Sequence, residues 1–179
     1  MNLVKTPLKD AFIIEPTIFS DKRGFFLETH NAKDWEKNGL DFTFVQDNHS
    51  YSEQNILRGL HFQFTKPQGK LVRVINGEVF DVAVDLRRSS ETFGKWYGIT
   101  LSAKNKKQFW IPPGFAHGFY VMSHNADFEY KCTDYYDKDD EGCILWNDKS
   151  INIKWPCENP ILSEKDSNGQ SFNSIFRKI

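Results

Sequence analysis

Short apolar runs, separated by Gly, Pro, Asn and Asp, follow one another from about residue 12 to residue 146. Such a series of short strands and turns is typical of a β-sandwich or a β-barrel. The segment Val79–Leu86 has the clearest period of two, because bulky apolar side chains occupy every second position and the positions between them include Asp81 and Asp85. We therefore predict a half-buried strand there, entered through the turn Asn76-Gly77.

Helical patterns are short and rare in this sequence. Asn31 is suited to cap a helix over residues 32–37, and Gly39 is suited to end it. Residues 147–179 are more polar than the segment before them, so we expect a C-terminal extension of loops and one helical turn that packs back on the barrel. The prediction is thus an all-β fold, a barrel with short peripheral helices, in a single domain over residues 1–179.

The composition fits one globular domain and excludes some partners. A chain of 179 residues is long enough for a single domain with a sizeable core. Aromatic residues make up 15% of the chain, which supplies core mass and stacking surfaces for a ring-shaped ligand. The net charge is −1 and the charges are interspersed, so the chain has no basic stripe and nucleic acid is not an expected partner.

The chain shows no targeting or membrane segment and no cysteine motif. Its N-terminus lacks the apolar run of a signal peptide, and no stretch approaches the roughly 18 apolar residues of a spanning helix. We therefore expect a cytoplasmic protein without a membrane partner. The cysteines, Cys132, Cys143 and Cys157, form no CxxC pair and leave an odd thiol, which disfavours a disulfide framework and a zinc site.

Two histidines stand in strand-like apolar surroundings, and such strands would bring both imidazoles into one pocket. In residues 57–63, strict alternation puts His61 on the face opposite the bulky apolar side chains. The pattern Pro-x-Gly-x-x-His that ends at His117 resembles one of the two motifs of the cupin β-barrel. Metal-binding relatives of such barrels carry a second histidine two residues after the first, but Gln63 stands there and is a poor transition-metal ligand. The pair therefore favours proton chemistry without a metal.

Two tyrosines form the third candidate group. Tyr130 and Tyr136 are evenly spaced in residues 128–136, which predicts that they share one face of a strand. The ordinary pKa of tyrosine, about 10, lies near that of an enol, so tyrosine suits the protonation of an enolate. Packing is the alternative role of such alternating aromatic residues.

Eight blocks of the sequence occur in the order found in one enzyme family. Over nearly its whole length the chain resembles the dTDP-4-dehydrorhamnose 3,5-epimerases, cupin-fold enzymes of dTDP-L-rhamnose synthesis. The blocks are Asp21–Phe26, Gln46–Ser50, Leu57–Gln63, Gly69–Arg73, Gly77–Asp85, Ile111–Phe119, Tyr130–Tyr136 and Leu162–Asp166.

The resemblance implies a set of catalytic roles. It makes His61 the general base, with Asp166 from the tail orienting and polarising the imidazole. Tyr130 would donate a proton on the opposite face of the sugar. Lys70 would lie near the carbonyl oxygen, where an ammonium group stabilises a developing enolate.

The resemblance also implies a substrate-binding set and a homodimer. Tyr136 matches the position that stacks on the thymine ring, and the cationic members of the set suit the diphosphate. Relatives are homodimers in which an N-terminal segment completes the neighbouring site. The substrate-contacting positions are Arg23, Glu28, Gln46, Asn48, Arg58, His117, Tyr136, Glu141 and Lys165.

The chemistry of a 4-keto-6-deoxy sugar explains these residue types. Carbons 3 and 5 both flank the carbonyl group, so both carry an acidified proton and either can invert through an enolate. One base and one acid across the ring therefore serve two epimerisations. Neither a metal nor a redox cofactor is expected, provided that Lys70 and other donors stabilise the oxyanion.

Three features depart from this pattern. Arg58 falls on the face opposite His61 under strict alternation, so a shared site requires a bulge or a contact at the strand's entry. Residues 137–140 replace a proline-containing segment, which leaves the position of Glu141 open, and Gln170 stands where proline is frequent.

Three functions other than the double epimerase are alternatives for this sequence. A single-centre epimerase, acting at carbon 3 or carbon 5 of a related nucleotide sugar, remains open. A non-catalytic nucleotide-sugar binding module would not need His61, Tyr130, Lys70 and Asp166 together. A metal-dependent cupin dioxygenase would need further ligands near His61.

Overall fold

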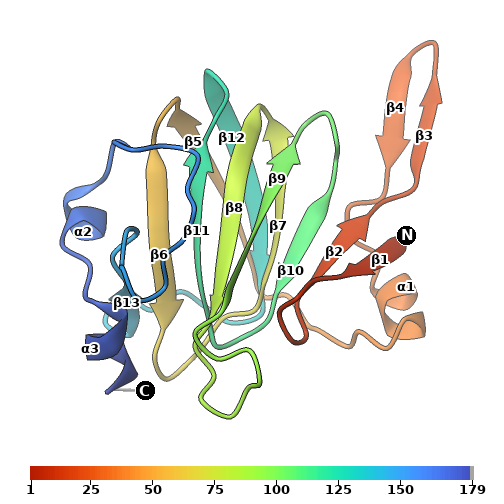
Figure 1. Cartoon of the computed structure of the whole chain (residues 1–179). Coiled ribbons are helices and arrows are strands. Elements are labelled where there is room, and N and C mark those ends of the chain that lie inside the picture. Colours follow the sequence, from red (N-terminus) through yellow and green to blue (C-terminus); the bar gives the residue numbers. More distant parts are fainter. Residues whose placement is uncertain (178–179) are drawn as a thin grey trace.

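Antiparallel strands make up most of the computed structural model, which describes residues 1–177 (Figure 1). They form two large sheets and one hairpin. The first large sheet has the order β1 (Asn2–Lys5), β2 (Phe12–Glu15), β10 (Gln108–Ile111), β7 (Lys70–Asn76), β12 (Asn125–Cys132), β5 (Gln46–Glu53). The second has the order β13 (Glu141–Cys143), β6 (Leu57–Gln63), β11 (Phe115–Val121), β8 (Glu78–Asp85), β9 (Trp96–Ser102).

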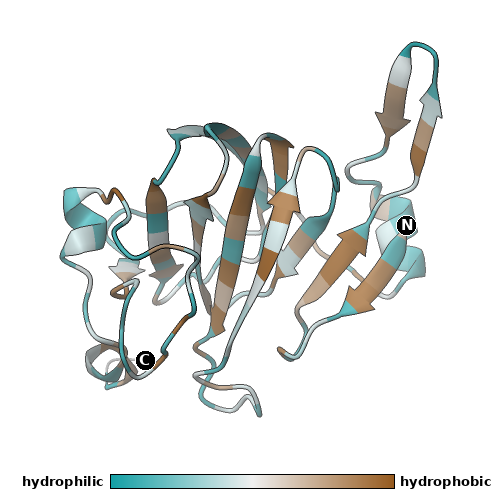
Figure 2. Cartoon of the chain, turned by 45° about the horizontal axis from the view of Figure 1, so that its top comes forward, coloured by the Kyte–Doolittle hydropathy of each residue, from teal (hydrophilic) through white to brown (hydrophobic). Residues whose placement is uncertain are grey.

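The two large sheets face each other across the main core, as in a jelly roll. Val72, Phe109 and Phe128 of the first sheet pack in one cluster with Val79 and Phe119 of the second. Figure 2 shows the corresponding brown, hydrophobic bands along the strands. The all-β prediction is therefore confirmed, and its physical basis is the period of two that points alternate side chains into this core.

Strand β8 is buried on both faces, so the prediction of a half-buried strand is wrong. Its outer face, with Val82 and Val84, is covered by Ile151 and Ile175 from the C-terminal segment. The inner face carries Asp81 and side chains that pack in the main core. The alternation of apolar and acidic residues suggested an exposed face, but both acids are buried with partners: Asp81 contacts His117 of β11, and Asp85 accepts hydrogen bonds from Arg87 and other residues of the loop that follows β8.

The C-terminal segment contains two short helices instead of the single expected turn. They are α2 (Glu164–Ser167) and α3 (Phe172–Phe176), and each begins after a serine whose hydroxyl oxygen accepts a hydrogen bond from a backbone N–H of the first turn. Gln170 joins this segment to β13, because its backbone N–H donates to the carbonyl of Cys143 at 2.8 Å. A proline at that position would lack this donor.

The predicted helix after Asn31 is confirmed as α1 (Ala32–Lys37). The side-chain oxygen of Asn31 accepts no capping hydrogen bond from the helix, and the side-chain amide nitrogen donates to Glu28. Trp35 of α1 packs on Trp110 of β10, and this aromatic cluster covers the outer face of the first sheet. No helix within residues 1–177 is long and apolar enough to cross a membrane.

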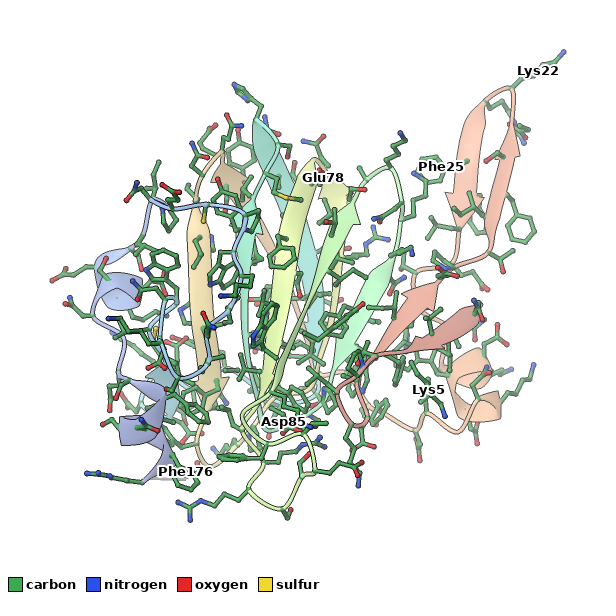
Figure 3. All side chains as sticks on the ribbon, in the orientation of Figure 1. Lys5, Lys22, Phe25, Glu78, Asp85 and Phe176 are labelled. Atoms are coloured by element: carbon green, nitrogen blue, oxygen red, sulfur yellow. The ribbon has the colours of Figure 1, made fainter. Side chains whose placement is uncertain are left out.

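A hairpin of β3 (Ile18–Asp21) and β4 (Gly24–Leu27) projects away from both large sheets (Figures 1 and 3). Lys22 stands at its tip in Figure 3. Phe19, Phe25 and Phe26 are 61%, 60% and 65% exposed, which is unusual for three phenylalanines on one ribbon. The hairpin thus offers an apolar surface that the described part of its own chain leaves uncovered.

Candidate active site

A cavity of about 330 Å³ is lined by both large sheets. It brings together most of the residues singled out in the sequence, and the acid Asp166 lies directly behind one of them. The predicted residues that line it are Gln46, Asn48, Arg58, His61, Lys70, His117, Tyr130, Tyr136, Glu141 and Lys165. The sequence reasoning missed Ser50, Gln68, Gly118, Phe119 and Phe128.

Strand β5 supplies one wall through simple alternation. Gln46, Asn48 and Ser50 face the cavity, whereas His49 lies on the opposite face and contacts Asp127 at 2.9 Å. The same period of two that identified the first two members could have identified Ser50. The amide of Gln46 donates to the side-chain oxygen of Asn48 at 3.0 Å, which fixes both amides before any ligand binds.

A bulge in β6 puts Arg58 and His61 in the same cavity. His61 is paired with His117 in β11, but Arg58 is paired with Phe119, so three steps in β6 match two in β11. Gly59 is required at this bulge because its φ is +114° and a Cβ there would lie 2.6 Å from the Cα of Gly118. Of the two possibilities that strict alternation left open, a bulge or a contact at the strand's entry, the structure has the bulge.

His61 and Asp166 form a tight pair. Nε2 of His61 lies 2.5 Å from Oδ1 of Asp166, whose side chain is 4% exposed. Ser163 donates its hydroxyl to the other carboxylate oxygen at 2.7 Å. Burial alone would raise the pKa of Asp166, but the hydrogen bonds from His61 and Ser163 lower it below its ordinary value. The ionised carboxylate holds the imidazole with its proton on Nε2, which leaves the lone pair of Nδ1 to act as a base.

Tyr130 and Lys70 reach the cavity from the sheet opposite His61. Tyr130 lies on β12 and Lys70 on β7. Burial raises the pKa of Tyr130 to about 12, so its hydroxyl keeps its proton at neutral pH. Burial lowers the pKa of Lys70, and the acidic groups around it, including Glu141 and Asp81, act against that shift. An acid and a cation thus face a base across one cavity.

The mouth of the cavity is formed by Tyr136, Glu141 and Lys165. Strand β12 ends at Cys132, so the prediction that Tyr136 shares a strand with Tyr130 is wrong, although both line the cavity. Tyr136 donates its hydroxyl to Glu141 at 3.1 Å, and the ammonium of Lys165 contacts the same carboxylate at 2.9 Å. These contacts place an aromatic ring and a cation beside each other at the entrance.

His117 is paired with Asp81, a contact that was not predicted from the sequence. Its Nε2 lies 2.9 Å from Oδ2 of Asp81, and both side chains are buried. The other oxygen of Asp81 has no hydrogen-bond partner among the described residues. An aspartate inside an apolar strand is itself a signal, because a buried carboxylate requires a partner.

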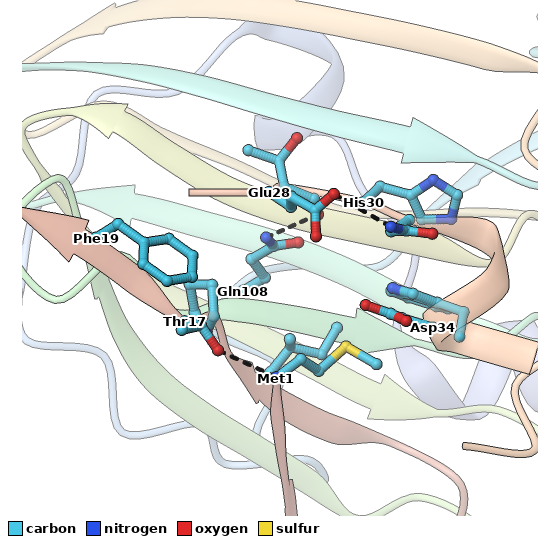
Figure 4. A pocket seen from close by; sticks show the side chains of 12 residues that line it. Met1, Thr17, Phe19, Glu28, His30, Asp34 and Gln108 are labelled. Carbon is cyan, nitrogen blue, oxygen red and sulfur yellow. Dashed lines mark hydrogen bonds between the residues drawn. The ribbon is translucent and has the colours of Figure 1, made fainter. Parts of the chain in front are cut away.

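Arg23 and Glu28 do not reach this cavity. Arg23 lies at the hairpin tip, where it pairs with Asp21. Glu28 lines a separate cavity of about 230 Å³ beside α1 (Figure 4). That cavity also contains His30, but burial lowers the pKa of His30 and no hydrogen bond among the described residues reaches its buried Nε2, so it holds no acid–base pair of the kind formed by His61.

Comparison with known proteins agrees with this geometry. Residues 5–174 match the family described as dTDP-4-dehydrorhamnose 3,5-epimerase. The chain belongs to this epimerase family. The dTDP-4-dehydrorhamnose 3,5-epimerase of Shigella flexneri is 59% identical over 174 residues, which cover 96% of this chain and 96% of that protein. The prediction that the chain is an isomerase of the dTDP-4-dehydrorhamnose 3,5-epimerase type is therefore confirmed.

Solved structures of epimerases confirm the cupin-type barrel. The enzyme from Elizabethkingia anophelis is 54% identical, with a TM-score of 0.92 and coverage of 97% of both chains. The 3,5-epimerase of Legionella pneumophila, solved in complex with dTDP-4-keto-L-rhamnose, has a TM-score of 0.94 at 53% identity and covers 97% of this chain and 94% of its own. A 3'-monoepimerase from Streptomyces bikiniensis, solved with dTDP-quinovose, has a TM-score of 0.91 at 28% identity, covering 98% and 90% of the two chains.

Proposed function

We propose that this chain converts dTDP-4-dehydro-6-deoxy-D-glucose to dTDP-4-dehydro-L-rhamnose by epimerisation at carbons 3 and 5, a step of dTDP-L-rhamnose biosynthesis. One observation carries the proposal: a cavity in which the base His61, backed by Asp166, faces Tyr130 and Lys70. A binding module would have no use for a buried His–Asp pair opposite a protonated tyrosine.

The reaction follows from these positions. Nδ1 of His61 removes the proton from carbon 3 or carbon 5, and the electron pair of the broken C–H bond moves into the ring to form an enolate at the C4 oxygen. The ammonium of Lys70 stabilises that oxyanion. Tyr130 then delivers its proton to the opposite face of the same carbon, which inverts it. Solvent returns the proton to the tyrosinate and removes one from His61, so the enzyme is regenerated without a change of oxidation state.

The remaining side chains of the cavity bind the nucleotide part. We assign the thymine ring to the face of Tyr136 and the diphosphate to the cations Arg58 and Lys165, because guanidinium and ammonium groups suit phosphate oxygens. Gln46 and Asn48 supply amide donors and acceptors on the same wall. His117, held by Asp81, supplies a further polar contact to the substrate.

Proton NMR in deuterium oxide tests the proposal. We expect the signals at carbons 3 and 5 of dTDP-4-keto-6-deoxyglucose to disappear only with active protein. Loss of one signal would instead establish a single-centre epimerase, a function that the similarity to the 3'-monoepimerase supports. Absence of exchange at both carbons would contradict the proposed function.

We further propose that two copies of the chain form a homodimer in which Arg23 and Glu28 of one copy complete the site of the other. Two observations support this: both residues lie outside the cavity of their own chain, and the ribbon that carries Arg23 exposes three phenylalanines. A symmetric dimer would cover this apolar ribbon in both copies.

Mixing two impaired variants tests the shared site. We expect Arg23→Ala to raise the KM by roughly tenfold or more through loss of a charged hydrogen bond to the diphosphate. When this variant is refolded with His61→Ala, each mixed dimer should contain one complete site, which restores roughly a quarter of the wild-type rate at low substrate concentration. Lys22→Ala at the same tip should keep wild-type activity. No recovery on mixing would contradict a shared site.

The partly buried position of Lys70 predicts the alkaline side of the pH profile. Since burial lowers the pKa of this ammonium, it should lose its proton at a lower pH than an exposed lysine, and kcat/KM should fall as the charge is lost. Lys70→Arg keeps its charge and should move this limb to higher pH, at a reduced maximum rate. Lys107→Arg, at an exposed ion pair with Glu15, should leave the profile unchanged. An unshifted limb in Lys70→Arg would contradict the role of Lys70.

A further inference from the structure

Three side chains of different chemistry meet behind the base. They are His61 from β6, Cys143 from β13 and Asp166 from α2, and one ligand atom of each lies within 4.8 Å of the other two. Sγ of Cys143 is 3.8 Å from Oδ1 of Asp166, which is itself 2.5 Å from Nε2 of His61. Local sequence patterns do not reveal this group, because the three residues come from separate segments and no CxxC motif is present.

We propose that His61, Cys143 and Asp166 form an inhibitory binding site for a thiophilic divalent cation, with Zn²⁺ as the best match. Thiolate, imidazole and carboxylate are the ligand types that zinc takes, with bond lengths of about 2.0–2.3 Å. Tetrahedral coordination at those lengths puts ligand atoms roughly 3.3–3.6 Å apart. The His61–Asp166 contact would therefore open by less than about 1 Å, and the Cys143–Asp166 contact would shorten by a few tenths of an ångström.

The charges of the site favour such a cation. A thiolate and a carboxylate together neutralise a divalent ion, so the occupied site carries no net charge in its partly buried position. Without a metal, burial and the neighbouring Asp166 raise the pKa of Cys143 to about 12, so the thiol keeps its proton. Zinc binding would release that proton to solvent as the Zn–S bond forms. Lys165 opposes this shift in the thiol pKa and Glu141 adds to it, and both lie at the same end of the cavity.

The same geometry explains why a bound ion would inhibit. Zinc coordinated to Nε2 would leave the imidazole proton on Nδ1, and His61 would then have no lone pair for the substrate. His61 lines the cavity, so a water molecule or a substrate oxygen could fill the fourth coordination position from that side. Magnesium prefers oxygen ligands and octahedral geometry, so it should not bind here. The inhibition rests on the proposed base role of His61, whereas the binding does not.

Cobalt spectroscopy tests the binding independently of activity. Co²⁺ added to the metal-free protein should give a sulfur-to-cobalt charge-transfer band, which Cys143→Ser and Cys143→Ala should both lose. Cys157→Ser, which removes a free thiol that does not belong to this group of three, should keep the band. A spectrum without a thiolate band, or a band that survives in both Cys143 variants, would overturn the proposal.

Zinc titration of the exchange reaction tests the inhibition. We expect Zn²⁺ to abolish turnover reversibly, with recovery on chelation and no effect of Mg²⁺. The inhibitory zinc concentration should fall by about tenfold for each unit by which the pH rises, since zinc binding releases one proton. In Cys143→Ser it should rise by at least about tenfold, measured against the zinc-free rate of that variant. Equal zinc sensitivity of Cys143→Ser and Cys157→Ser would overturn the inhibitory site, and a cobalt band without zinc inhibition would count against the base role of His61 instead.

Discussion

Replacement of His61 by alanine is expected to lower kcat by about 10²–10⁴-fold, because the reaction would lose its proposed base. The affinity for dTDP should change little, since the proposed nucleotide contacts come from other side chains of the cavity. The measurement is the rate of deuterium incorporation at carbons 3 and 5, combined with calorimetric titration of dTDP. Both quantities are needed, because a folding defect would lower the two together.

The chain supplies a matched control for this experiment. His49 also contacts an aspartate, Asp127 at 2.9 Å, but it lies on the face of β5 that points away from the cavity. His49→Ala should therefore retain wild-type exchange and wild-type binding. Unaltered turnover in His61→Ala, or an equal loss in both variants, would refute the assignment of the base.

Tyr130→Phe is expected to separate exchange from inversion. His61 still removes the substrate proton in this variant, so deuterium should still enter at the reacting carbons from the face of the base. The opposite face lacks its donor, and formation of the epimerised product should fall by about 10²–10⁴-fold. NMR of the sugar ring measures both quantities in one sample. Phenylalanine keeps the ring that packs in the main core, so the fold should be preserved.

Tyr51→Phe provides the comparison. The hydroxyl of Tyr51 donates to Glu53 at 2.9 Å on the exposed face of β5, and its loss should affect neither exchange nor inversion. If Tyr130→Phe lost exchange and inversion to the same extent, the hydroxyl would be required for proton removal, and the proposed division of roles would be wrong.

Much of the fold could be predicted, because a strand that faces the core of a two-sheet barrel has apolar side chains at every second position of its sequence. Strand β12 shows that period directly, because Ala126, Phe128 and Cys132 are buried at alternate positions. The double burial of β8 could not be predicted, because the segment that covers its outer face lies more than 60 residues later in the sequence. The second tail helix was missed although Ser171, its N-cap, is visible in the sequence.

Individual residues of the site could be predicted from the sequence, whereas contacts between pairs of residues were harder to predict. Resemblance identified His61 and Tyr130, and the structure places both in one cavity. The pairing of His117 with Asp81 was missed because cross-strand register is not contained in the local pattern. The bulge at Gly59 could be foreseen only as one way for Arg58 and His61 to share a site. The contributions of Arg23 and Glu28 stay predictions, as does the homodimer.

The His61–Asp166 pair also has a consequence for synthesis and turnover of the protein. Every strand of the two large sheets precedes residue 147, whereas Asp166, which we propose orients the base, follows them in the chain. A chain that is still being synthesised can therefore form the strand pairs of both sheets before Asp166 reaches His61, and under the proposed mechanism it gains activity only when residues 147–177 pack on the barrel. For the same reason, we expect one proteolytic cut in the connection over residues 147–163 to abolish activity without removing a strand.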